Sequence, residues 1–316
     1  MQRILLVKTS SLGDVVHNLP VASDIVAAHP GAVIDWVVEE SFSAIPALHS
    51  AVRRAIPIAV RRWRKAWWHA STRREIQDFV RELRAVEYEA VIDTQGLLKS
   101  ALVTRVARGR RYGLDWSSSR EPLSVFYDRT FNVPRSQAAV ERNRVLAARA
   151  LDYTPPPQVS YGITTVRRDF DWLSSDRYAV LIHATSADRK LWPEDRWIAL
   201  GLALADRGIS SVLPWGSANE RERSERLSRS ISGSVVPPHL DVRDLAGLLA
   251  QAACAIGVDT GLTHLAGALG VATVGIYTAT DPSRTGLYGC DRAVSLGGIR
   301  CAPDVDQVVQ DMERLA

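Results

Sequence analysis

A short polar loop containing a carboxylate follows the first apolar segment of the chain. Residues 8–14 read KTSSLGD and come directly after the apolar residues 4–7. An ionised Asp14 at this point could act as a general base toward a hydroxyl group, and Gly13 would let a ligand approach the backbone closely. Asp14 could equally cap a helix N-terminus. The loop has the spacing of neither a P-loop nor a dinucleotide-binding motif.

A second loop combines hydroxyl groups with a cation. Thr185, Ser186 and Lys190 follow an apolar run, and Pro193 would open the next helix. Hydroxyls, a lysine and a helix N-terminus can together hold a phosphate group. The alternative is a surface loop with a solvated lysine.

A third loop begins with a carboxylate, Asp259, at the end of another apolar run. Thr260 and Gly261 would turn the chain into a helix whose free N–H groups, at Gly261 and Leu262, form an anion site. In the alternative interpretation, Asp259 is only an N-cap and His264 only a residue on the helix surface.

A basic segment rich in tryptophan lies at residues 60–68. Residues 41–74 contain eight basic and no acidic residues. The segment could be a solvated face, a site for single-stranded nucleic acid, a membrane interface, or a site for phosphate and carboxylate groups of a substrate. The residues concerned are Arg61, Arg62, Trp63, Arg64, Lys65, Trp67 and Trp68.

Apolar runs and helical patterns alternate along the chain and must position these loops. The pattern is typical of parallel βαβ units and predicts the α/β class. Ligands of such sheets bind beyond the carboxyl ends of the strands, where the three loops lie. We expect strands at residues 4–7, 33–38, 90–93, 179–183, 209–213, 255–258 and 272–277, and helices at 15–28, 194–206, 220–230 and 242–251.

Length and charge indicate two domains of different character. A chain of 316 residues is enough for about two domains, and Pro155–Pro157 would form a semi-rigid linker and hinge. We therefore expect domains at 1–157 and 158–316, with the C-terminal helix packing back on the first. The net charge is +7 before the linker and −3 after it, so the first domain should meet an anionic partner. The acidic second half argues against nucleic acid.

Composition excludes several classes of protein. With 46% hydrophobic and 23% charged residues, the chain is neither disordered nor fibrous. The cysteines, Cys254, Cys290 and Cys301, match no zinc pattern and no disulfide framework. The uncharged residues 260–280 are as long as a membrane span, but four glycines break them.

Several segments together resemble the heptosyltransferase family of lipopolysaccharide core assembly. They are VKTSSLGD at 7–14, DWVVEE at 35–40, RRWRKAW at 61–67, AVID at 90–93, DW at 115–116, REP at 120–122, LPWG at 213–216 and VDTGL at 258–262. The resemblance implies a GT-B fold, two Rossmann-like domains facing across a cleft. It also implies an inverting transfer of heptose from ADP-L-glycero-D-manno-heptose, held by the second domain, to the Kdo region of Kdo2-lipid A, held by the first.

The resemblance further implies roles for individual residues. Asp14 would be the general base and Lys190 would stabilise the departing ADP. Donor-binding residues would be Thr185, Ser186, Lys190, Trp215, Glu220, Asp259, Thr260, Gly261, Leu262 and His264; acceptor-binding residues would be Ser10, Gly13, Arg61, Arg62, Arg64, Lys65 and Arg120. Ser186 replaces a threonine common in the family, and Thr278-Ala279 replaces Gly-Pro or a similar pair.

Lysine and the helix dipole would supply the positive charge, so we expect neither a metal nor a cofactor. We expect a cytoplasmic enzyme, peripheral to the inner membrane. The alternatives are another heptosyltransferase of the core, adding the second heptose, a GT-B sugar-nucleotide epimerase, and a non-catalytic binding module.

Overall fold

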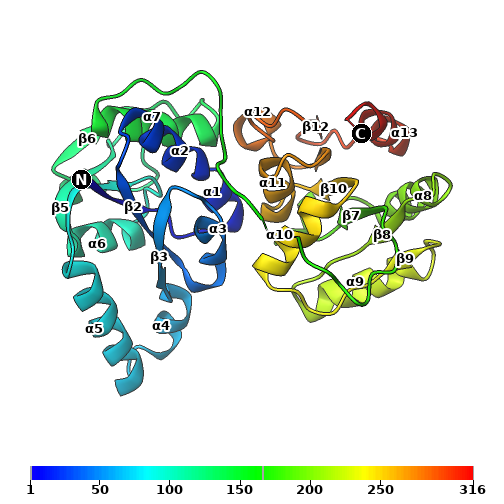
Figure 1. The fold of residues 1–316 in the computed structure, drawn as a ribbon, viewed down its shortest axis with the longest axis horizontal. Helices are drawn as coiled ribbons and strands as arrows, with labels where there is room; N and C mark the ends of the chain where they lie inside the picture. The colour runs from blue at the N-terminus through cyan, green and yellow to red at the C-terminus, as the bar shows by residue number, and fades with distance from the viewer. Residues whose placement is uncertain (1, 166, 316) are drawn as a thin grey trace. The chain divides into compact units, whose positions relative to one another are not determined.

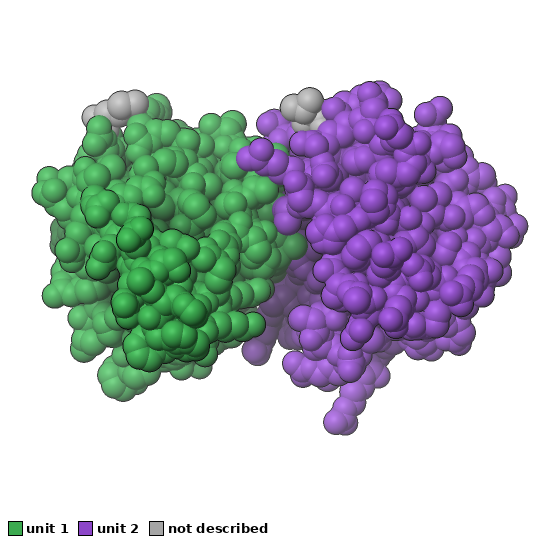
Figure 2. All heavy atoms as spheres, turned by 90° about the horizontal axis from the view of Figure 1, so that it is seen from below, with its two compact units in different colours: residues 1–163 green, residues 164–316 purple. Residues whose placement is uncertain are grey.

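The computed structural model describes residues 2–165 and 167–315 and divides into two compact units, residues 1–163 and 164–316 (Figure 2). The predicted boundary after Pro157 therefore lies inside the first unit. The reason is a set of contacts that hold the linker there. The Arg144 guanidinium donates to the carbonyl of Pro156, and Ser50 N donates to Gly162 O at 3.2 Å.

The first unit contains a six-stranded, fully parallel sheet with the order β3-β2-β1-β4-β5-β6 (Figure 1). Its strands are β1 Arg3–Val7, β2 Val33–Glu39, β3 Val52–Ile58, β4 Glu87–Asp93, β5 Arg108–Leu114 and β6 Arg129–Phe131. Its helices are α1 Leu12–Val16, α2 Leu19–Ala28, α3 Ala44–Ala47, α4 Val60–Ala66, α5 Ala70–Arg84, α6 Leu98–Val106 and α7 Ala139–Leu151, with 3-10 turns η1 Glu40–Phe42 and η2 Ser124–Phe126.

The second unit repeats this topology with the order β12-β11-β10-β7-β8-β9. Its strands are β7 Tyr178–Ile182, β8 Ser210–Val212, β9 Ser234–Val235, β10 Cys254–Val258, β11 Thr273–Tyr277 and β12 Ala293–Gly297. Its helices are α8 Glu194–Ala205, α9 Ala218–Ser228, α10 Val242–Gln251, α11 Gly261–Ala268, α12 Pro282–Thr285 and α13 Val305–Leu315, with a 3-10 turn η3 Asp188–Lys190. The expected βαβ organisation is confirmed.

In both units the strand order reverses between the first and the fourth strand. The pairs are β1 with β4 in the first unit and β7 with β10 in the second. Sheets of this kind bind ligands at such switch points, beyond the carboxyl ends of the strands. The loops carrying Asp14, Lys190 and Asp259 all follow these strands.

The segment after β1 differs from the single helix expected at residues 15–28. The chain forms α1 and α2 instead, separated at His17 and Asn18. Pro20 lies in the first turn of α2, where its missing N–H leaves no intrahelical partner unsatisfied. Ser11 is the N-cap of α1, so Asp14 is not an N-cap residue; it lies in the first turn.

The C-terminal helix α13 packs on the second unit, which corrects the expectation that it returns to the first. Val308 and Met312 are buried in the same core as Trp192 and Trp197. The apolar side of this amphipathic helix is thereby covered within its own unit. Within residues 2–165 and 167–315, no helix has the length and apolar character needed to cross a membrane.

Candidate donor and acceptor sites

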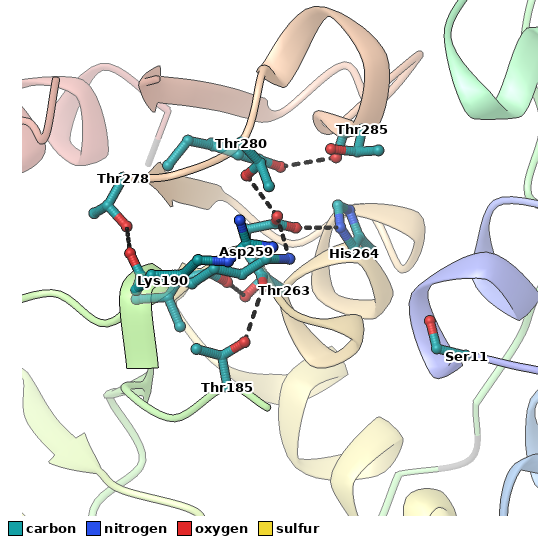
Figure 3. Close-up of polar contacts among 12 residues, drawn as sticks. Ser11, Thr185, Lys190, Asp259, Thr263, His264, Thr278, Thr280 and Thr285 are labelled. Carbon is teal, nitrogen blue, oxygen red and sulfur yellow. Dashed lines mark hydrogen bonds and ion pairs between the residues drawn. The ribbon is translucent and has the colours of Figure 1, made fainter. Parts of the chain in front are cut away.

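A network of polar side chains surrounds Asp259 in the second unit (Figure 3). Its Oδ2 atom accepts hydrogen bonds from Lys190 Nζ at 2.7 Å and from Thr280 Oγ1 at 2.6 Å, and its Oδ1 atom lies 3.3 Å from Nε2 of His264. Burial alone would raise the pKa of Asp259, but the contacts with His264, Lys190 and Thr280 hold it far below its ordinary value. Asp259 is therefore ionised at neutral pH.

Local sequence explains how Asp259 reaches this position. The buried strand β10 ends at Val258, and α11 begins two residues after Asp259 with Thr260 as its N-cap. A Cβ on Gly257 would lie 2.2 Å from Thr263 Oγ1, so glycine permits the close approach of helix and strand. The first N–H groups of α11, including those of Gly261 and Leu262, have no acceptor within the helix.

The loop between β7 and α8 contributes the other side of the network. Thr185 Oγ1 donates to the backbone oxygen of Asp259 at 3.3 Å, and Thr278 Oγ1 donates to Arg189 O at 3.0 Å. Ser186 is exposed. The structure thus brings together four of the residues predicted to bind the donor, Thr185, Lys190, Asp259 and His264. Thr278 and Thr280 also lie in this network, and the sequence did not identify them as site residues.

In the first unit, Asp14 is held by the N-terminus of its own helix. Its Oδ2 atom accepts hydrogen bonds from Ser11 N at 2.8 Å and Ser11 Oγ at 3.0 Å. Burial would raise the pKa of Asp14, but the ammonium of Lys8, the hydrogen bonds from Ser11 and the charge of His17 keep it below its ordinary value. A carboxylate that stays ionised can accept a proton.

Lys8 is a buried residue that the sequence did not single out for chemistry. Its Nζ atom donates to Thr94 O at 2.8 Å and lies 3.4 Å from Asn143 Oδ1. Burial is the main reason that the pKa of Lys8 lies below its ordinary value, against the opposing effect of Asp14 and Asp93. The hydrogen bonds of Lys8 thus go to neutral oxygens, while its charge acts on Asp14.

The loop after β4 supports the loop after β1. Gln95 Oε1 accepts hydrogen bonds from Thr9 N and Ser10 N, both at 3.1 Å, and Lys99 donates to Ser10 Oγ. Ser10 therefore lies beside the ammonium group of Lys99. Gly13 lies inside α1 and not in a free loop.

A sequence model of glycosyltransferase family 9 (heptosyltransferase) matches residues 76–313. This chain belongs to that family. It is 46% identical to lipopolysaccharide heptosyltransferase 1 of Escherichia coli K12 over 295 residues, 92% of each chain. Two structures of the E. coli heptosyltransferase WaaC match all of both chains, one with ADP (TM-score 0.91, 43% identity) and one with ADP-2-deoxy-2-fluoro heptose (TM-score 0.88, 42% identity).

These likenesses confirm two predictions: the chain has the GT-B fold of two Rossmann-like domains, and it is a glycosyltransferase. The roles of individual residues stay predictions. Most of those residues lie at the switch points of the two sheets, whereas Arg61, Arg62, Arg64, Lys65, Arg120, Trp215 and Glu220 lie elsewhere.

The basic segment at residues 60–66 forms α4, and one of its arginines has acidic partners. Arg62 forms ion pairs with Glu40 at 3.1 Å and Glu75 at 2.8 Å. Residues 41–74 contain no acidic residue, which suggested that the basic side chains have no acidic partners nearby. This inference was wrong for Arg62, because Glu40 and Glu75 lie just outside that range. The Arg61 guanidinium lies over the ring of Phe42, 5.4 Å from its centre.

Arg64 and Lys65 are exposed, and within the described part of the chain neither forms an ion pair. Arg120 is also exposed. Its charge acts on the buried Lys8 together with that of Arg142. Arg142, which the sequence reasoning missed, donates to Ser118 O at 2.8 Å; burial, followed by the charges of Arg135 and Arg120, lowers its pKa.

Trp215 lies in the loop before α9, and Glu220 lies in the first turn of that helix. Glu220 Oε2 accepts a hydrogen bond from Gly216 N at 2.7 Å, and Trp215 Nε1 donates to Pro237 O at 2.8 Å. Trp215 also lines a pocket of about 440 Å³ with Arg221 and His239. In the described residues, no group of three or more His, Cys, Asp or Glu side chains is arranged to hold a metal ion.

Proposed function

We propose that this heptosyltransferase transfers L-glycero-D-manno-heptose from ADP-heptose to the Kdo residue of Kdo2-lipid A during assembly of the lipopolysaccharide inner core. The ion pair between Lys190 and Asp259, at the end of β10, carries the proposal. The pair supports the proposal because a cation suited to a diphosphate and an ionised acceptor suited to sugar hydroxyls lie on adjoining loops. The likeness to lipopolysaccharide heptosyltransferase 1, and to a relative solved with an ADP-heptose analogue, supports this donor and acceptor.

On the donor side, Lys190, Thr185, Ser186 and the first N–H groups of α11 bind the diphosphate. Asp259 orients the heptose hydroxyls, together with His264. We assign Trp215 and Glu220 to the nucleoside. When the bond between the anomeric carbon and the phosphate oxygen breaks, its electron pair leaves with ADP, and Lys190 stabilises the added negative charge.

On the acceptor side, Asp14 accepts the proton of the attacking Kdo hydroxyl, whose oxygen forms the new bond to the anomeric carbon with inversion. Ser10, in the loop before α1, and Gly13, which precedes Asp14 within α1, contact the acceptor beside the base. Acidic groups of the acceptor bind the exposed cations Arg61, Arg64, Lys65 and Arg120, and we add Arg142. Arg62 contributes less because Glu40 and Glu75 already neutralise it.

Lysine and helix N–H groups serve as the counter-charges, so the proposal includes no metal and no cofactor. Because the acceptor is a lipid, the enzyme works at the cytoplasmic face of the inner membrane as a peripheral protein. Nucleic acid has no place in the proposal.

The deciding experiment measures ADP release from ADP-heptose without acceptor, with Kdo2-lipid A and with a heptosylated acceptor, for the native enzyme and for Asp14→Asn. We expect release that depends on the acceptor and that falls by about 10²–10⁴-fold in the variant, the usual contribution of a general base. Turnover of the nucleotide sugar without acceptor would indicate an epimerase. Release only with a heptosylated acceptor would indicate transfer of the second heptose, and no release at all would indicate a binding protein.

A further inference from the structure

Two neighbouring tryptophans are exposed at the turn between α4 and α5. Trp67 is 63% and Trp68 55% exposed, and their rings pack edge to face with centres 6.1 Å apart. Side chains of this size are usually buried, so an exposed aromatic pair indicates a surface that meets another body. Figure 1 shows that α4 and α5 project together beyond the sheet of the first unit.

The helical pair that carries these tryptophans is firmly anchored. Trp63 packs edge to face on Phe79, with ring centres 5.8 Å apart, and its Nε1 donates to Glu75 at 2.9 Å. Phe79 and Leu83 bury the inner side of α5 in the core of the first unit. Arg73 donates to Trp68 O at 3.1 Å. The turn is therefore a defined element that presents Trp67 and Trp68 outward.

Positive charge surrounds the tryptophans. Residues 60–74 contain no Asp or Glu, and within the described chain only one of their basic side chains, Arg62, forms an ion pair. The remaining basic residues, all exposed, are Arg61, Arg64, Lys65, Arg73 and Arg74. An excess of unpaired cations beside exposed indole rings complements a surface that is both anionic and partly apolar.

We infer that the turn at residues 67–69, with the basic residues of α4 and the first turn of α5, docks this enzyme on an anionic lipid bilayer. Indole rings prefer the headgroup region of bilayers, where one edge is apolar and the N–H group is hydrated. The two rings lie on a projecting turn, which a fluid headgroup layer can surround. This inference rests on the proposed membrane contact, but it assigns that contact to a site that binds lipid without acceptor or donor.

The test uses the full chain and vesicles free of lipopolysaccharide. Binding is measured by flotation with phosphatidylcholine vesicles and with vesicles of phosphatidylcholine and phosphatidylglycerol in equal parts. We expect binding to the anionic vesicles only, weakened by salt. The double variant Trp67→Ser/Trp68→Ser should bind at least about tenfold more weakly. Trp116→Ser, which removes another exposed tryptophan of the same unit (69% exposed), is the matched control and should bind like the native chain.

A second measurement separates this inference from the proposed function. The double variant should retain its kcat/KM with a deacylated, water-soluble acceptor and lose activity only with acceptor embedded in vesicles. Equal loss with the soluble acceptor would mean that the tryptophans bind the acceptor sugar, which overturns the inference. If the native chain did not bind anionic vesicles, or bound a single-stranded oligonucleotide more tightly than the vesicles, the docking inference would be overturned. The transferase proposal would stay intact. Unchanged thermal unfolding confirms that the variants fold.

Discussion

Lys190 Nζ and Asp259 Oδ2 lie 2.7 Å apart, and their side chains are 22% and 7% exposed. The pair joins two loops that are 69 residues apart in the sequence. It also means that the cation proposed for the diphosphate is balanced by the carboxylate proposed for the sugar. When the donor binds, Lys190 and Asp259 would exchange part of their contact with each other for contacts with the diphosphate and the sugar. The contribution of each side chain can be tested separately.

Replacement of Lys190 by methionine should reduce kcat by about 10²–10³-fold, because the charge on departing ADP loses its main stabilising cation. The measurement is ADP release at saturating donor and acceptor. Arg207→Met is the control, since Arg207 forms an exposed ion pair with Glu313 in the same unit and should change kcat less than about twofold. An equal loss in both variants would indicate general damage to the unit.

Replacement of Thr280 by valine should raise the donor KM by about 10–100-fold. The hydroxyl donates to the carboxylate of Asp259, and a hydrogen bond to a charged group contributes about 1.5–3 kcal/mol. Thr278→Val is a matched control on the same loop, because Thr278 donates to a neutral carbonyl. Its effect should be clearly smaller. A larger effect of Thr278→Val would contradict the role given to Asp259.

A chelator should leave the transferase activity unchanged. Lys190 and the N-terminus of α11 provide the positive charge near Asp259, and the carboxylate of Asp259 is already paired with Lys190 and Thr280. The measurement is ADP release after incubation with EDTA and dialysis. Loss of activity that added Mg²⁺ restores would show that the diphosphate is bound through a metal ion.

The places of the three candidate loops in the fold could be predicted from the sequence because each follows a buried strand, and the structure puts these strands at the switch points. Asp259 and Lys190 could be recognised from an apolar run followed by polar residues, which is a local pattern. Thr280 and Lys8 could not, because their roles depend on contacts across 21 and 86 residues of chain. Lys8 directly follows the apolar strand β1, and the amino-acid composition of this segment does not indicate that the lysine is buried.

The errors of prediction have the same physical origin. The three prolines at 155–157 are typical of a linker, yet Arg144, which also pairs with the buried Asp24, ties Pro156 to the first unit. The paired α4 and α5 bring Glu75 back to Arg62, so a count of charges along the chain overestimated the free basic surface. Strand β6, only three residues long, gave no usable pattern.

Replacement of Gly162 by alanine should destabilise the first unit by about 2–4 kcal/mol. Gly162 has φ +59°, and a Cβ there would lie 2.3 Å from His49 Nε2 and 2.6 Å from Ser23 Oγ. The cost combines left-handed backbone with overpacking. Gly31→Ala, at φ +87° with nothing within 4 Å, carries only the backbone cost of about 1–2 kcal/mol. Urea unfolding measures both, and equal losses would contradict the contact with His49.

Replacement of Lys8 by methionine should shift the acid limb of the pH profile of kcat/KM to higher pH. In the native chain the groups that act on Asp14 are Lys8 directly after β1, the cap residues Ser11 and His17 of α1, and Lys99 on α6. Because the pKa of Asp14 lies below the ordinary value of an aspartate, the base stays ionised in neutral and mildly acidic solution.

Burial is already the largest single influence on Asp14, and without the ammonium of Lys8 to oppose it the pKa of Asp14 rises. The acid limb of kcat/KM should then lie at higher pH than in the native enzyme. The native Asp14 contributes stability above the pKa of about 3.9 that it has in the unfolded chain, and loses it as the pH falls further. Lys8→Met should remove that contribution, and it should also remove the cost of the buried ammonium, whose lowered pKa opposes folding at neutral pH. A variant that loses activity equally at every pH, with the limb unmoved, would show that Lys8 only supports the packing of β1.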